Sequence, residues 1–76
     1  MSKKRTNADR AETAAKGVRA ACKDRGDCIT IDQDSLMDLL ADLRHLCDRD
    51  GLDFAECDRT AQDYYVGDLE EEKENS

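Results

Sequence analysis

The chain has 76 residues, of which 41% are charged and 4% are aromatic, and its formal net charge is −7. This length predicts a single domain with a thin hydrophobic core, because small folds bury a smaller share of their surface than large ones. No apolar run approaches the roughly 20 residues that cross a bilayer, and the basic start at residues 3–5 precedes polar residues rather than a signal-peptide core. We therefore expect a cytoplasmic protein without a membrane segment, which associates with itself as a homodimer.

The charge is divided into two opposed blocks. Residues 1–26 hold eight Lys or Arg and three acids, whereas residues 27–76 hold four Lys or Arg and sixteen acids. Such a division steers association with partners and does not by itself catalyse a reaction. We divide the chain into a basic arm (residues 1–6), a single helical domain (residues 7–67) and an acidic flexible tail (residues 68–76).

The first predicted element is a helix from about Asn7 to Lys23. Small apolar residues recur there at steps of three and four, at Ala8, Ala11, Ala15, Val18 and Cys22. Gly26 follows as a helix stop. The β-branched run from Cys28 to Ile31 then predicts a short extended segment, either a strand paired across a dimer or, as we favour, a linker.

The second helix is predicted from a cap at Asp34 or Ser35 to a left-handed glycine at Gly51. Its apolar stripe consists of Leu36, Leu39, Leu40, Leu43, Leu46 and Cys47. Asp53 is predicted to cap a third helix that ends at Gly67, with Phe54, Cys57, Ala61, Tyr64 and Tyr65 on its buried face. The two helices and their short turn form a helical hairpin, so the fold class is all-α, a small three-helix unit.

No motif in the chain carries catalytic chemistry, so we expect a protein that is not an enzyme. The four cysteines and one histidine lack the paired spacing of structural zinc sites, and we predict no metal and no cofactor. Cys22, Cys47 and Cys57 fall on apolar stripes and are interpreted as reduced core thiols, with Cys22–Cys28 the most plausible disulfide. A metal- or redox-linked module on Cys22, Cys28 and Cys47 stays open as an alternative.

The candidate partner-binding residues are acids of the hairpin. They are Asp38, Asp42, Asp48, Glu56 and Asp63. One interpretation is a solvated face that keeps the protein dispersed. The other is mimicry of a nucleic-acid backbone, since a groove that holds DNA or RNA gains affinity largely from phosphate charge. The partner would then be a host protein complex that binds nucleic acid.

An alternative assigns nucleic-acid contact to the basic residues of the first block. These are Lys3, Lys4, Arg5, Arg10 and Arg19. Direct nucleic-acid binding is less favoured for two reasons. The acidic second block would repel the same duplex, and no aromatic residue that could stack on nucleobases lies among these basic residues. A simpler account has the first helix packed on the acidic hairpin of its own or a neighbouring chain.

The segment from Ser35 to Phe54 resembles short uncharacterised proteins of bacterial phages, plasmids and integrative elements. These share the pattern D-L-L-A-D-L-x-H-x-x-D-x-x-G-x-D-F, followed by a helix that ends near an aromatic pair, here Tyr64 and Tyr65. The resemblance covers about residues 35–65, and no activity is attached to it. By analogy with other small acidic proteins of such elements, it implies a non-enzymatic inhibitor of host defence, similar to anti-CRISPR proteins.

Overall fold

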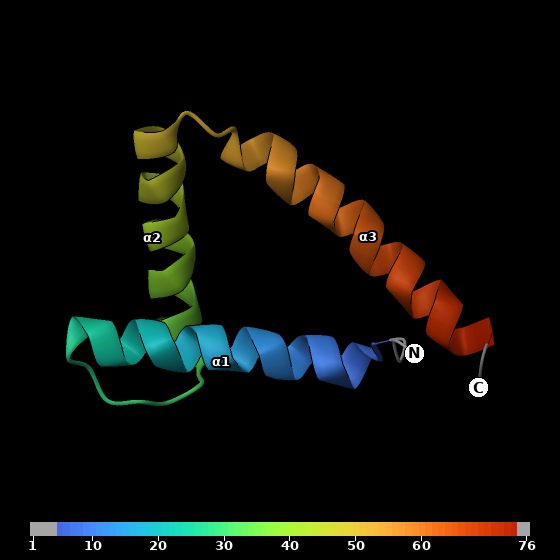
Figure 1. Ribbon diagram of the computed structural model, residues 1–76, viewed down its shortest axis with the longest axis horizontal. Helices are drawn as coiled ribbons and strands as arrows, with labels where there is room; N and C mark the ends of the chain where they lie inside the picture. The colour runs from blue at the N-terminus through green and yellow to red at the C-terminus, as the bar shows by residue number, and fades with distance from the viewer. Residues whose placement is uncertain (1–4, 75–76) are drawn as a thin grey trace.

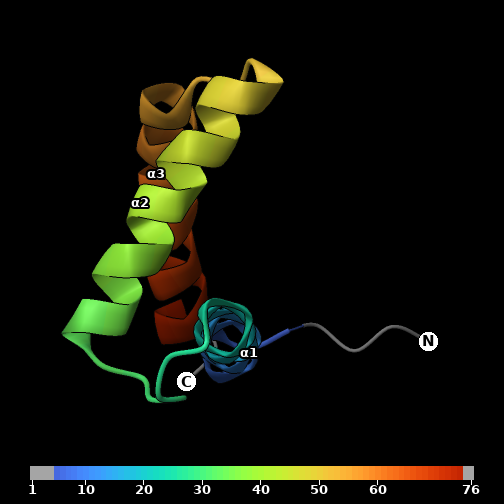
Figure 2. The same ribbon diagram turned by 90° about the vertical axis from the view of Figure 1, so that its left-hand side faces the viewer.

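The computed structural model describes residues 5–74, which form three α-helices: α1 (Asn7–Arg25), α2 (Gln33–Asp50) and α3 (Phe54–Glu74). The described residues contain no strand, and residues 28–31 belong to an irregular connection, so the predicted all-α three-helix unit and its linker are confirmed. The helices outline an open triangle in which α2 rises from α1 and α3 descends towards the other end of α1 (Figure 1). Viewed along α1, both other helices rise from it (Figure 2).

Local capping bonds define where the helices begin and end. The Thr6 hydroxyl accepts from the Asp9 N–H at 3.1 Å, and the Asp9 carboxylate accepts from the Thr6 N–H at 3.0 Å. Gly26 and Gly51 follow α1 and α2 in the left-handed conformation, with φ of 79° and 71°. Both predicted glycine stops are therefore confirmed, since a left-handed residue without a Cβ ends a helix at little steric cost.

The start of α2 differs from the prediction. Asp32 is the N-cap, and its carboxylate accepts from the Ser35 N–H at 2.8 Å while the Ser35 hydroxyl accepts from the Asp32 N–H at 3.0 Å. Ser35 is thus the third residue of the helix and half of a reciprocal capping box, rather than the cap. The predicted caps at Asp34 and Ser35 are wrong by two or three residues.

The end of α3 is also corrected. The Glu56 N–H donates to Asp53 Oδ1 at 3.0 Å, which agrees with the predicted cap at Asp53. The helix, however, continues through Gly67 to Glu74, so the predicted end at Gly67 is wrong. Residues 68–74 of the predicted tail are helical, whereas residues 75 and 76, like residues 1–4 of the basic arm, lie outside the described residues.

The buried core is much smaller than the sequence pattern predicts. Among the described residues, the buried apolar side chains are Val18, Cys22 and Cys47, which are 6%, 1% and 8% exposed. The predicted core positions Tyr64 and Tyr65 are instead 69% and 58% exposed, and Cys57 is exposed as well. The Cα radius of gyration of 14.7 Å exceeds the roughly 11 Å expected for a compact domain of this length. The three helices therefore form an open frame with unpartnered apolar faces.

Candidate functional site

Two of the predicted partner-binding acids converge on one arginine of the same chain. Arg25, in the last turn of α1, places its guanidinium 3.3 Å from the Asp42 carboxylate and 3.8 Å from that of Asp38. It also bonds Asp27 at 3.0 Å, and this hydrogen bond is the main cause that raises the pKa of Arg25. Asp38 and Asp42 lie one helical turn apart, as predicted, but Arg25 offsets part of their charge and ties α1 to α2.

The other three predicted acids are exposed along α2 and α3. Within residues 5–74, Asp48 and Asp63 make no ion pair, so their charge faces solvent. Glu56 pairs with Arg59 at 2.6 Å on the same helix. Because α2 and α3 diverge from the turn at Gly51 (Figure 1), the five acids are spread over two helices rather than gathered in one cluster. We call Asp38, Asp42, Asp48, Glu56 and Asp63 the acidic surface.

The described basic residues of the alternative interface are already engaged within the chain. Arg5 donates to the Thr13 hydroxyl at 2.7 Å, and Arg19 pairs with Glu12 at 3.4 Å. Arg10 is half-buried and pairs with Asp68 of α3 at 3.5 Å. Lys3 and Lys4 lie outside the described residues. A phosphate backbone would therefore compete with existing contacts of all three arginines.

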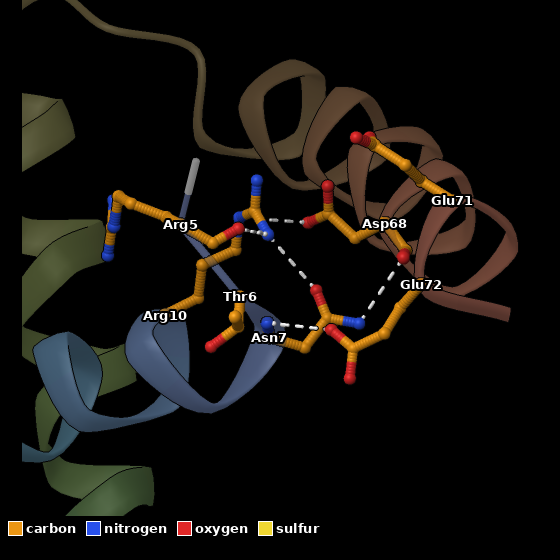
Figure 3. Close-up of a pocket in the computed structure, with 7 residues that line it drawn as sticks. All are labelled: Arg5, Thr6, Asn7, Arg10, Asp68, Glu71 and Glu72. Carbon is orange, nitrogen blue, oxygen red and sulfur yellow. Dashed lines mark hydrogen bonds and ion pairs between the residues drawn. The ribbon is translucent and has the colours of Figure 1, made fainter. Parts of the chain in front are cut away.

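Arg10 belongs to a polar junction that joins the start of α1 to the end of α3, which we call the polar clasp (Figure 3). The Asn7 N–H donates to the Glu72 carboxylate at 2.9 Å, and the Asn7 side-chain amide donates to the Asp68 carbonyl at 3.2 Å. Arg10 donates to the carbonyl of Arg5 and to the Asn7 side-chain oxygen, both at 3.1 Å. The two bonds from Asn7 and the Arg10–Asp68 ion pair hold α3 against α1.

A small hollow of about 220 Å³ opens at the polar clasp. Carboxylates and guanidinium groups both line it, and among them Arg10 and Asp68 form an ion pair (Figure 3). Sequence reasoning missed the polar clasp and the role of Arg25, because both depend on contacts between residues far apart in the chain. The only sequence signal was the opposed charge of the two blocks, which predicts attraction between them without naming the pairs.

The cysteines offer no assembled metal site in the described part of the chain. All four thiols are free, and Cys22–Cys28, the pair considered most plausible for a disulfide, is not bridged. The Cys22 thiol donates to the Thr30 carbonyl at 3.7 Å, and burial raises the pKa of the Cys47 thiol. Residues 5–74 contain no group of three or more His, Cys, Asp or Glu side chains placed to hold a metal ion. The metal- or redox-linked alternative on Cys22, Cys28 and Cys47 gains no support from this arrangement.

Across residues 5–74, no helix combines the length and the apolar character needed to traverse a membrane. Comparison with known protein families, with curated proteins and with solved structures found no match to this chain. The functional interpretation therefore depends on the surfaces described above.

Proposed function

We propose that the protein acts by binding rather than by catalysis, as an accessory protein of a phage or mobile element in a bacterial cytoplasm. Its partner is a host defence complex that binds nucleic acid, and the acidic surface occupies the groove that would hold a phosphate backbone. The observation that carries this proposal is the exposure of all five acids on two long helices. Repeated carboxylates on a rod-like helix are negatively charged, as the phosphates of DNA and RNA are, and so attract a basic groove.

The ion pairs refine which acids contribute most. Asp38 and Asp42 share Arg25, so their net attraction for a basic partner is reduced. Asp48 and Asp63 have no such offset within residues 5–74. We therefore assign the larger part of the affinity to Asp48 and Asp63. The nucleic-acid-binding alternative is not advanced, because Arg5, Arg10 and Arg19 are engaged within the chain.

The test is affinity capture of partners from a nuclease-treated bacterial lysate, with identification by mass spectrometry. We expect a nucleic-acid-binding complex that an added DNA or RNA duplex releases from the captured protein. The double variant Asp48→Asn with Asp63→Asn should weaken this binding at least tenfold. Its matched control is Asp24→Lys, which changes the net charge by the same amount on exposed α1, where Asp24 makes no ion pair within residues 5–74.

Two results would contradict the proposal. Failure of a duplex to release the captured complex would mean that the acidic surface does not occupy a nucleic-acid groove. Equal weakening by the double variant and by Asp24→Lys would mean that only net charge matters, not the position of the acids.

A further inference from the structure

The long helix α3 contributes no side chain to the buried core. Every side chain of residues 54–73 is at least partly exposed, whereas Val18 and Cys22 of α1 and Ser35 of α2 are buried where those two helices meet. Burial of apolar surface is the main force that holds helices together. The corner of α1 and α2 is therefore the stable part of the frame, and α3 lacks this kind of attachment.

The contacts of α3 with the other helices lie near its two ends. At its start, the Arg44 guanidinium of α2 lies 4.3 Å from the centroid of the Phe54 ring. At its far end, the polar clasp joins it to α1 (Figure 1). Between these points, residues 55–67 form no hydrogen bond or ion pair with α1 or α2 within the described part of the chain.

The polar clasp is built from groups that water and ions can reach. All seven residues that line its hollow are polar or charged, so no apolar side chain stabilises it. Its ion pair joins Arg10 and Asp68 at 3.5 Å, and these side chains are 38% and 25% exposed. Such hydrogen bonds replace bonds to water, and salt screens exposed ion pairs, so both add little net stability. The polar clasp is therefore a weak attachment that salt loosens.

The turn between α2 and α3 supplies a pivot. The Leu52 N–H donates to the Cys47 carbonyl at 2.9 Å, so this bond belongs to the end of α2. The Cys57 N–H donates to the Asp53 carbonyl at 3.0 Å, so this bond belongs to the start of α3. Among residues 47–57, no backbone hydrogen bond crosses the peptide between Leu52 and Asp53, and rotation there breaks none. Hinges typically lie at such ends of secondary-structure elements.

We propose that α3 is a movable arm, which the polar clasp holds against α1 and which pivots between Leu52 and Asp53 when the clasp opens. The chain then has two states, clasped and released, and rising salt shifts the population towards the released state. Release changes the spacing between the acids of α2 and those of α3. The inference does not depend on the proposed function, because neither state requires a partner.

Double electron–electron resonance measures the two states directly. Nitroxide labels are attached at Lys16 of α1 and Glu70 of α3 through a ketone-bearing amino acid, which leaves the four cysteines unlabelled. Both positions are exposed and make no ion pair within residues 5–74. We expect a narrow distance distribution from the clasped state and a second population from the released state. The second population should grow about threefold when sodium chloride is raised from about 20 mM to about 500 mM.

One variant opens the polar clasp without deleting a side chain. Asp68→Asn removes the ion pair with Arg10 and keeps the backbone carbonyl that accepts from Asn7. Its released population should exceed that of the wild type about threefold at low salt and should respond less to added salt. The matched control is Asp63→Asn, which removes one charge from the same helix at a residue without an ion pair within residues 5–74, and it should behave as the wild type. Circular dichroism checks that both variants retain their helices.

Two results would overturn the movable arm. A single distance distribution that neither salt nor Asp68→Asn changes would mean that α3 stays fixed against α1. An equal response to Asp68→Asn and Asp63→Asn would mean that the charge of the helix, and not the polar clasp, sets its position. Either result would leave the proposed function of the acidic surface standing.

Discussion

The same substitution at two glycines is expected to have opposite effects on stability. Gly51 has a φ of 71°, and a Cβ built there has no atom within 4 Å. The substitution Gly51→Ala is therefore destabilising only through the strain of a left-handed backbone. That strain is about 1–2 kcal/mol for a residue with a side chain. Gly67 lies inside α3 with equally open surroundings, and Gly67→Ala should stabilise the helix by about 0.5–1 kcal/mol.

Thermal unfolding followed by circular dichroism at 222 nm measures both variants at one fixed protein concentration. A difference of 1 kcal/mol shifts Tm by roughly 4–8 °C in a domain of this size, so the two variants should differ by about 6–24 °C. Gly67→Ala should unfold above the wild-type chain, and Gly51→Ala below it. Destabilisation by both substitutions would refute the reasoning, because it would mean that α3 ends at Gly67 in a left-handed residue.

Two further predictions concern the cap of α2 and the polar clasp. The hydrogen bond from the Ser35 N–H lowers the pKa of Asp32, so the cap should be fully stabilising above the unfolded value of about 3.9 and weaken as the pH falls below it. Asp32→Asn keeps a capping oxygen, and its urea unfolding should lose less stability on acidification than that of the wild type; equal losses would contradict this assignment. Asn7→Ala removes the side-chain hydrogen bond to the Asp68 carbonyl. Because such a bond contributes about 1 kcal/mol to stability, hydrogen exchange of the amides of residues 68–74 should become roughly fivefold faster. Unchanged exchange in that segment would show that the clasp does not hold α3.

Much of the secondary structure was predictable because its signals are local. Gly26, Gly51 and Asp53 act on backbone groups within a few residues, so their positions in the sequence are sufficient. Gly67 was misread because a glycine inside a helix and a glycine that ends one look alike in sequence. What distinguishes it is the support of the end of α3 by Asn7, more than 60 residues earlier in the chain.

The candidate site divides in the same way. The sequence alone determined that acids repeat along α2 and α3, and that apolar side chains, among them the leucines of α2, recur at helical spacing. Only the tertiary structure decided that Arg25 pairs with both Asp38 and Asp42 and that Tyr65 remains exposed. The physical reason is that helical periodicity shows which side chains share a face, whereas the neighbour of that face depends on how the helices diverge in space.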